Sequence, residues 1–461
     1  MRFPPASSLV IACLLASLNA LPATAENWPH WRGPTWNGST DETNLPDHWD
    51  QGKNVAWIAA LPGRSGATPV IWEDSVFLPS PDADGNLLLL CLDSKTGKIR
   101  WKREVAPGNA VRGKNNMASP SAVTDGKRVA VMFGTGDLAA YDFEGKQLWS
   151  CNLANEYGKL ALMWIYGSSP LLYRDKLYVE VLQRSDPAVY RHAADDKPTR
   201  DSFLLCLDPQ SGKKLWRQVR KNNAREESQE AYTSPIVRPT ERGAEILLFG
   251  GDCLTSHDPE TGVELWRSGS LNPKKSPVWR TIVSPVAGAE EVFVCLPRTF
   301  NPSLAISPGK AGTKAVAAVA WQSSEASADV PTPLYYRGKL FVLDGNRQKL
   351  ICVDPKTGST QWSGRLETDE IFSASPTGAD GKVYCISEGG TVVVLSAGKE
   401  FKIISRFALE APGEQAGLDP NGVPLRGGSA ESGPTLSTIA VANGHLFVRT
   451  AKYLYCIGAK P

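Results

Sequence analysis

A phrase that recurs along the chain restricts the fold more than any other feature. The phrase opens with Ser-Pro or Thr-Pro and continues as a short apolar strand, and in four units it ends with an Asp-x-x-x-Gly turn followed by a tryptophan. A period near 40–50 residues, built of short strands, predicts a radial array of four-stranded blades. The openings lie at Thr68-Pro69, Ser119-Pro120, Ser169-Pro170, Ser234-Pro235, Ser284-Pro285, Thr332-Pro333, Ser375-Pro376 and, in degenerate form, Ser437-Thr438.

The first unit shows how the phrase encodes a blade. Its strands are predicted at residues 69–72, 76–78, 87–92 and 98–102, and the turn from Asp93 to Gly97 precedes the last strand. Asp accepts hydrogen bonds from turn amides, and Gly allows a positive φ. Because one blade alone leaves its faces in water, we predict that the recurring tryptophans dock neighbouring blades together. These docking residues are Trp57, Trp101, Trp149, Trp216, Trp266 and Trp362.

The two ends of the chain predict how the ring closes. The last unit, residues 435–457, supplies three strands and no final tryptophan strand. The segment from Asn54 to Ala60 carries Trp57 and can pair with residues 453–457, which would remove the exposed sheet edges. We therefore predict an all-β, eight-bladed β-propeller of four-stranded antiparallel blades over residues 51–461, closed by an N-terminal strand in the last blade. Residues 26–50 are predicted to be an extension packed on the rim.

The N-terminal 25 residues resemble an export signal. An apolar run from Leu9 to Ala20 precedes the small-residue cleavage site Ala23-Thr24-Ala25. Twelve apolar residues are too few to span a bilayer, so no transmembrane segment is expected. We predict an exported protein of the periplasm or the extracellular space, with membrane association through Cys13 left open.

Charge and cysteine usage narrow the function classes. A formal net charge of +2 implies neither nucleic acid nor an anionic membrane as a partner. Four cysteines, at Cys91, Cys206, Cys352 and Cys456, occupy the same strand position of four different units. Equivalent positions of separate blades are too far apart for disulfides, so we expect buried structural thiols.

The turn motif resembles that of a known family. Asp93, Thr96, Gly97, Lys98 and Trp101 are similar to the tryptophan-docking repeat of quinoprotein alcohol dehydrogenases. The chain also resembles the secreted PQQ-like repeat propellers related to the outer-membrane assembly lipoprotein BamB. That second resemblance rests on residues 28–34, Trp-Pro-His-Trp-Arg-Gly-Pro, and on residues 444–457 at the C-terminal end.

The resemblance implies a fold, and it names cofactors to consider. The quinoprotein dehydrogenases carry pyrroloquinoline quinone beside an adjacent cysteine pair, with Ca²⁺ held by Glu, Asn and Asp. The present chain has no adjacent cysteine pair. We assign no cofactor from the residues, and pyrroloquinoline quinone and Ca²⁺ are possible by family resemblance alone.

Motifs that would specify chemistry are weak. Residues 134–139, Gly-Thr-Gly-Asp-Leu-Ala, match a dinucleotide fingerprint, but they continue into a strand instead of a helix. His192, Asp195 and Asp196 could ligate a metal, yet they lie in a charged insertion at residues 181–202 that is predicted to be a solvated loop. We assign no catalytic and no metal-binding residue.

The geometry of a propeller indicates where a binding site would lie. Segments just before each opening lead into the innermost strands, so their side chains are predicted to surround the axial mouth as a funnel. The alternative is that they fill the axis and satisfy loop backbone. A second long insertion, at residues 405–434, adds loop surface. The funnel candidates are Asn115, Asn116, Trp164, Tyr166, Glu230, Tyr232, Arg280, Thr281, Glu370 and Phe372.

Three functions fit these patterns. The first is an exported, non-catalytic binding or scaffold protein, BamB-like by resemblance, that takes a protein, peptide or small polar ligand at the funnel. An envelope or secreted protein would then be the partner. The second is an oxidoreductase that depends on pyrroloquinoline quinone and Ca²⁺. The third is a lyase or hydrolase, for which Glu230, Asp369 and Glu370 are the candidate acid and base residues.

Overall fold

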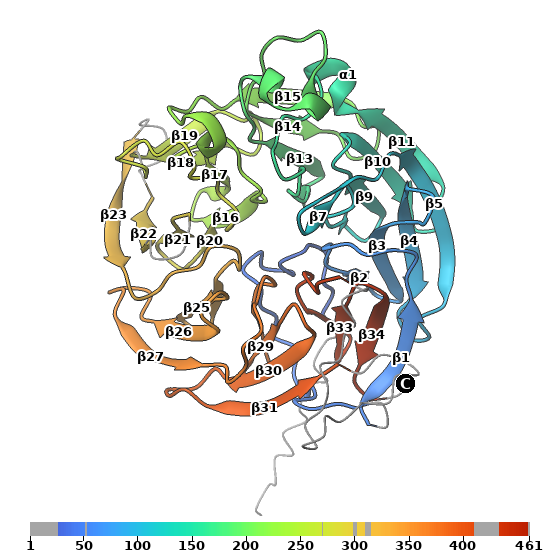
Figure 1. Cartoon of the computed structure of the whole chain (residues 1–461), viewed down its shortest axis with the longest axis vertical. Coiled ribbons are helices and arrows are strands. Elements are labelled where there is room, and N and C mark those ends of the chain that lie inside the picture. Colours follow the sequence, from blue (N-terminus) through green and yellow to red (C-terminus); the bar gives the residue numbers. More distant parts are fainter. Residues whose placement is uncertain are drawn as a thin grey trace, which may run out of the picture.

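The computed structural model describes residues 26–50, 53–269, 271–297, 302–308, 315–409 and 433–459. The predicted signal peptide, with Cys13, lies outside the described residues, as does most of the insertion predicted at 405–434. The sheets follow one another around a central axis in sequence order, and the chain returns to its start (Figure 1). The described residues form six four-stranded sheets, one two-stranded hairpin and one eight-stranded sheet, which consists of two four-stranded runs joined edge to edge. Counting these runs separately gives eight four-stranded units, which we call blades 1 to 8.

Every blade is a meander in which consecutive strands pair antiparallel, with the first strand innermost. Blade 1 consists of β2 (Val70–Trp72), β3 (Ser75–Pro81), β4 (Asn86–Asp93) and β5 (Ile99–Pro107). Blade 2 consists of β8 (Val123–Thr124), β9 (Arg128–Met132), β10 (Asp137–Asp142) and β11 (Gln147–Asn152). Blade 3 consists of β12 (Leu171–Tyr173), β13 (Lys176–Val181), β14 (Phe203–Leu207) and β15 (Lys214–Val219). Blade 4 consists of β16 (Ile236–Thr240), β17 (Gly243–Gly250), β18 (Cys253–His257) and β19 (Glu264–Ser268).

The second half of the ring repeats the arrangement. Blade 5 consists of β20 (Val286–Ala287), β21 (Val292–Cys295), β22 (Ser303–Ser307) and β23 (Ala315–Ser323). Blade 6 consists of β24 (Leu334–Tyr336), β25 (Lys339–Asp344), β26 (Lys349–Val353) and β27 (Thr360–Arg365). Blade 7 consists of β28 (Thr377–Ala379), β29 (Lys382–Ile386), β30 (Thr391–Ser396) and β31 (Ile403–Ala408). Blade 8 consists of β32 (Ala440–Ala442), β33 (His445–Arg449), β34 (Tyr453–Ile457) and β1 (Val55–Ala60).

Blade 8 confirms the predicted closure of the ring. Strand β1 pairs antiparallel with β34, with Trp57 opposite Cys456 and Ala59 opposite Leu454. The N-terminal strand thus completes the sheet that the C-terminal strands begin, and the two lie side by side in Figure 1. This pairing covers the edge that β34 would otherwise expose.

The docking tryptophans show why the repeat needs its glycine. The Trp57 indole lies against Gly97 of blade 1, where an added Cβ would come within 2.5 Å of the ring, and Gly97 has a φ of +70°. Trp57 Nε1 also donates to Ser94 O at 2.9 Å. Trp101, Trp149 and Trp216 lie against glycine turns of the following blades in the same way, at Gly145, Gly212 and Gly262. Blades 8, 1, 2 and 3 therefore each provide an indole that the following blade receives on a glycine turn.

Trp266 departs from this series. It is completely buried, and its Nε1 donates to Glu245 Oε2 of its own blade at 3.1 Å. Blade 5 offers no Asp-x-x-x-Gly turn to receive it, because the sequence at 308–309 is Pro-Gly. In its place, β19 pairs parallel with β23, from Trp266 opposite Ala315 to Ser268 opposite Ala317. The missing turn explains why these two blades form one eight-stranded sheet.

In two of the eight repeats, the residue equivalent to Thr68 is not the one that the opening phrase predicts. In blade 1, Thr68 precedes the first residue of the innermost strand by two positions. The residues that do so in blades 2 and 8 are Ser121 and Thr438, and not Ser119 and Ser437. The sequence Ser119-Pro120-Ser121 offers two serines, and the predicted register took the one followed by proline. The position of the strand, and not the proline, determines the equivalence.

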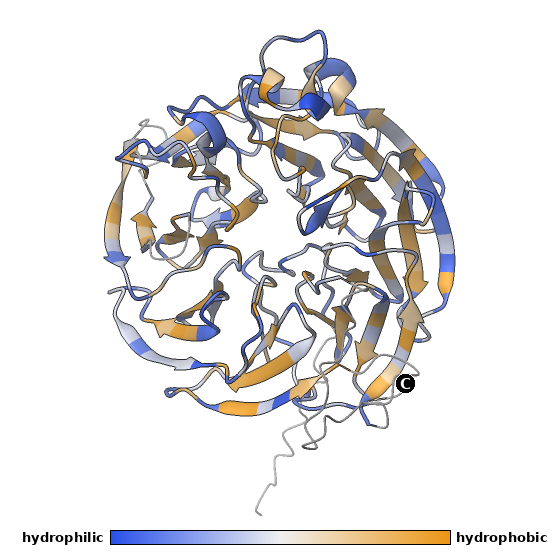
Figure 2. Ribbon diagram, in the orientation of Figure 1, coloured by the Kyte–Doolittle hydropathy of each residue, from blue (hydrophilic) through white to orange (hydrophobic). Residues whose placement is uncertain are grey.

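Helices are short in this fold. They are α1 (Leu153–Tyr157) and the 3₁₀ turns η1 (Pro187–Val189), η2 (Arg191–Ala193) and η3 (Glu226–Gln229). Over the described ranges, no helix has the length and apolar character that crossing a bilayer requires. Apolar residues concentrate on the inner strands of the blades, whereas the outermost strands carry many hydrophilic ones (Figure 2).

Candidate functional site at the propeller axis

The meander gives the ring two different faces. The turn between the first and second strands of each blade lies on one face, and the connection from the outermost strand to the next blade lies on the other. We call these the covered face and the open face. Residues 26–50 pack on the first: Thr124 N donates to Pro29 O at 3.0 Å and Gly378 N to Gly38 O at 2.9 Å. Both Thr124 and Gly378 belong to, or adjoin, first-to-second strand turns.

Arg32 anchors this extension. Its side chain is completely buried, and it donates to Pro376 O at 2.9 Å, to Pro333 O at 2.7 Å and to Asn37 O at 2.8 Å. Burial lowers the pKa of Arg32 to about 9, which still leaves it protonated at neutral pH. The guanidinium thereby ties the extension to the first strands of blades 6 and 7.

The extension also reaches the axis. We predicted a place on the rim for residues 26–50. In the structure, Trp28 bridges to Ile71 of the innermost strand β2, and Trp31 lines the central cavity. This cavity has a volume of about 150 Å³. Its wall has two tiers, because every blade contributes one residue to each. The inner tier is Thr68, Ser121, Ser169, Ser234, Ser284, Thr332, Ser375 and Thr438, and the outer tier, two residues earlier in each blade, is Gly66, Ser119, Gly167, Tyr232, Ile282, Val330, Ser373 and Leu436.

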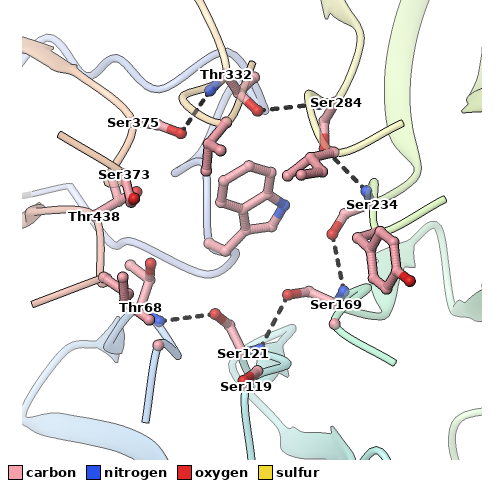
Figure 3. A pocket seen from close by; sticks show the side chains of 17 residues that line it. Thr68, Ser119, Ser121, Ser169, Ser234, Ser284, Thr332, Ser373, Ser375 and Thr438 are labelled. Atoms are coloured by element: carbon pink, nitrogen blue, oxygen red, sulfur yellow. Dashed lines mark hydrogen bonds between the residues drawn. The ribbon is translucent and has the colours of Figure 1, made fainter. Parts of the chain in front are cut away.

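The inner tier is a ring of hydroxyls linked by hydrogen bonds (Figure 3). The backbone N–H of each member donates to the side-chain oxygen of the next, as in Thr68 to Ser121 at 2.8 Å. Five more such bonds run from Ser121 through Ser169, Ser234, Ser284 and Thr332 to Ser375, with lengths of 2.8 to 3.0 Å. In the described part of the chain, no equivalent bond joins Ser375 to Thr438 or Thr438 to Thr68. The hydroxyl ring is thus interrupted at blade 8, where the chain ends meet.

One of the ten funnel candidates lines this cavity, and it is Tyr232. Four others are buried in the structure around it. Asn116 donates to Arg64 O at 2.6 Å, and Tyr166 donates to Glu180 O at 2.7 Å. Thr281 pairs with the Glu230 backbone, and Phe372 belongs to the core between blades 6 and 7. These four side chains lie in the interior and are not among the residues that line the cavity.

Glu230 is enclosed as well. Its carboxylate is completely buried and accepts hydrogen bonds from Met163 N at 2.8 Å, from the Tyr232 hydroxyl at 2.9 Å and from the Tyr190 hydroxyl. Burial raises the pKa of Glu230 above its usual value. Three donors of the chain itself therefore hold this carboxylate in the interior. Asp369 and Glu370 precede blade 7 and Glu230 precedes blade 4, so the three carboxylates do not form one group.

The remaining candidates are Asn115, Trp164, Arg280 and Glu370 on the open face, and the first three are linked across blade boundaries. Asn115 donates to Trp164 O at 3.2 Å, and Trp164 Nε1 donates to Glu227 at 3.4 Å. Arg280 approaches the same Glu227 carboxylate at 3.8 Å. Glu370 accepts a hydrogen bond from the Ser387 hydroxyl. The connections before blades 2, 3, 4 and 5 therefore meet on this face.

Apolar side chains are exposed on the same connections. Val111, in the hairpin of β6 (Val111–Arg112) and β7 (Asn115–Asn116), is 54% exposed, and Trp164 is 37% exposed. Val278 and Ile371 are exposed to 43% and 42%. We call these four residues the open-face patch. Polar contacts join their segments, since Lys114 of the hairpin pairs with Glu388 at 2.5 Å and Glu388 N donates to Ile371 O at 2.8 Å.

Sequence reasoning missed the hydroxyl ring and the role of Trp31. The ring residues stood in the opening phrase itself, where Ser or Thr recurs before the inner strand, and we treated them as markers of the repeat. A hydroxyl kept at one position in every repeat was the available signal. Nothing in the sequence of residues 26–50 indicated that Trp31 reaches the axis.

The lining of the axis does not fit a quinone with its calcium ion. Calcium takes six to eight oxygen ligands, and carboxylates are prominent among them. The described lining residues include no acid, base or side-chain amide. Within the part of the chain that the structure describes, no three His, Cys, Asp or Glu side chains gather in a way that could hold a metal.

Comparison with known proteins supports the fold. A family model described as outer membrane protein assembly factor BamB matches residues 48–184 and 310–400. A comparison with curated proteins gave no match.

Solved structures match over most of the chain. BamB from Moraxella catarrhalis is 12% identical with a TM-score of 0.55, covering 88% of this chain and 99% of its own. Quinohemoprotein alcohol dehydrogenase from Comamonas testosteroni is 12% identical with a TM-score of 0.60, over 94% and 81% of the two chains. The computationally designed Ika8 protein is 10% identical with a TM-score of 0.54, over 87% and 98%.

At such identities, the structural likenesses show the fold alone. The family match adds what the fold cannot, because it rests on sequence. It agrees with the resemblance that the tryptophan-docking repeat predicts. The chain is a PQQ-like β-propeller protein related to BamB.

Proposed function

We propose that this protein is an exported, non-catalytic binding protein whose open-face patch docks an apolar peptide segment of an envelope or secreted protein. The observation that carries the proposal is the patch itself. Its four side chains are exposed on connections before four different blades. Scattered single hydrophobic residues are normal on a surface, but several on one face favour a docking role.

The surroundings of the patch suit a protein partner. Arg112 lies over the Trp164 ring at 5.8 Å, and the side chains of Lys114, Glu227, Arg280 and Glu388 add both signs of charge. Aromatic residues and arginines are enriched at protein interfaces and carry much of their binding energy. Export follows from the predicted signal peptide, and the family description, an outer membrane assembly factor, agrees with an envelope location.

Selection of peptides from a displayed random library on the full chain tests the docking role. We expect apolar peptides whose affinity falls about 30-fold in Trp164→Ala, the effect of losing a hot spot worth ~2 kcal/mol. Leu215→Ala is the matched control, because Leu215 is 49% exposed on the outermost strand of blade 3. If no peptide is enriched, or if both variants weaken binding equally, the proposal fails.

The oxidoreductase alternative has its own test. The full chain is incubated with pyrroloquinoline quinone and Ca²⁺, and dye-linked alcohol oxidation is measured. The axial lining offers neither carboxylate nor amide ligands, so we expect no turnover above the free quinone. Sustained turnover would replace the binding role with a catalytic one.

A further inference from the structure

The hydroxyl ring has spare hydrogen-bond donors. A serine or threonine hydroxyl provides one donor and two acceptor lone pairs. Six ring oxygens, from Ser121 to Ser375, each accept one backbone N–H. Among the described residues, no acceptor receives the protons of these hydroxyls. Six buried O–H groups around one cavity therefore have no partner within the chain for donation.

The interruption at blade 8 leaves two further hydroxyls with no partner. Thr68 and Thr438 are 2% and 3% exposed, and both line the cavity. Neither Oγ1 atom has a hydrogen-bond partner in the described part of the chain. Neither atom is among the unpaired atoms that solvent cannot reach, so both hydroxyls are available to water or to a ligand in the cavity.

Trp31 lines the same cavity with its indole ring. Its Nε1 has almost no accessible surface and no partner within the described ranges, so this N–H does not face the cavity. Part of the outer tier is apolar, through Ile282, Val330 and Leu436, whereas Ser119 and Ser373 add hydroxyls. No described lining residue carries a carboxylate that would repel an anion. The cavity combines uncharged donors with an apolar wall.

We propose that the axial cavity binds a small carboxylate, with its oxygens on the inner-tier hydroxyls and its short apolar part against the outer tier. Carboxylate oxygens accept several hydrogen bonds, and bonds to a charged acceptor are the stronger ones. The volume of about 150 Å³ is roughly tenfold what one water needs and below the ~300 Å³ of typical ligand sites. It therefore suits a ligand of a few heavy atoms.

This site is separate from the open-face patch. Its residues are not those of the patch, so failure of peptide docking would leave the carboxylate site untouched. Two sources share the chemistry, namely a free short-chain acid and the terminal carboxylate of a bound peptide. The experiment distinguishes them.

Calorimetric titration of the full chain with formate, acetate and propionate tests the proposal. Propionamide and 1-propanol serve as neutral counterparts of nearly the same shape. We expect at least one acid to bind with a dissociation constant of about 1 mM, and its neutral counterparts at least tenfold more weakly. Absence of binding by every acid well above that concentration, or equal binding of the neutral counterparts, overturns the proposal.

The double variant Thr68→Val/Thr438→Val locates the site. Valine keeps the shape of threonine and removes a hydroxyl that has no partner, so the fold is expected to persist. We expect at least tenfold weaker binding of the acid. Ser256→Ala is the control, since Ser256 is a completely buried hydroxyl without a partner on β18, away from the axis. Unchanged affinity in the double variant contradicts the proposal, and the comparison with neutral counterparts stands even if that variant does not fold.

A tripeptide with a free carboxyl terminus and its amidated form decide the source. Competition with the acid by the free form alone means that a chain end enters the cavity. If neither tripeptide competes while free acids bind, the ligand is a small molecule. Competition by the amidated form contradicts carboxylate recognition.

Discussion

The two faces of the ring use the same repeat in opposite ways. On the covered face, Trp28 is completely buried and bridges to Ile71, and Arg32 satisfies three backbone carbonyls. On the open face, Val111 and Trp164 remain exposed on segments that are themselves held in place by hydrogen bonds. The N-terminal extension thus covers one face, whereas the other face keeps apolar side chains exposed to solvent. Stability and binding are thereby separated in space.

Substitution of Arg32 should cause the largest loss of stability among the variants that compare the two faces. In Arg32→Met, three carbonyl groups lose a charged donor, and each such bond is worth ~1.5–3 kcal/mol. We expect the free energy of unfolding in urea to fall by at least ~3 kcal/mol. Val111→Ser on the open face is the control, because Val111 is 54% exposed, and it should change the free energy of unfolding by less than ~0.5 kcal/mol. Equal effects would show that the two faces do not differ.

The hydroxyl ring gives the next largest effect. Thr332→Val removes the oxygen that accepts Ser284 N at 3.0 Å and leaves that buried N–H unpaired. We expect a loss of ~1–3 kcal/mol in urea unfolding. Thr438→Val, at the interruption of the ring, breaks no hydrogen bond of the described chain and should cost less than ~0.5 kcal/mol. Similar losses of unfolding free energy in both variants would mean that the hydroxyl ring is not interrupted at blade 8.

The pH dependence of the free energy of unfolding gives a smaller effect, and it arises from His30 on the covered face. Burial lowers the pKa of His30 from 6.5 to about 3, and His30 Nδ1 accepts from Arg32 N at 3.3 Å. Between these values, the unfolded state binds a proton and the folded state does not, so stability falls as pH decreases. The slope from this residue is ~1.4 kcal/mol per pH unit.

The variant His30→Asn isolates that contribution. Asparagine can still accept from Arg32 N but does not titrate, whereas His257, with a pKa of about 4, continues to contribute. Urea unfolding between pH 6.5 and pH 4 should show a shallower slope for the variant. An identical slope would mean that His30 is accessible to solvent.

Substitution of the open-face patch should have the smallest effect on stability. Ile371→Ser removes a side chain that is 42% exposed, so we expect the unfolding free energy to change by less than ~0.5 kcal/mol. Selected peptides should nevertheless bind more weakly. A large loss of stability would mean that Ile371 packs in the native chain and is unavailable for docking.

The sequence predicted the ring far better than the site. The pairing of residues 54–60 with residues 453–457 could be predicted, because strands and turns leave a periodic pattern in the sequence. The predicted register was wrong at Ser119-Pro120-Ser121, because two serines fit the phrase. The hydrogen bonds between blades involve Ser121, which the sequence alone did not indicate. The site could not be predicted because it depends on which side chains converge. Trp31 arrives at the axis from an extension that carries no repeat.

Oxidative footprinting by hydroxyl radicals tests the contrast between the faces most directly. In the folded full chain, we predict slow oxidation of Trp28 and Trp49, which are 0% and 3% exposed, and fast oxidation of Trp164. In Arg32→Met, Trp28 should become reactive while the rate of Trp164 stays unchanged. Comparable oxidation of Trp28 and Trp164 in the native chain would contradict a face sealed by the chain's own residues.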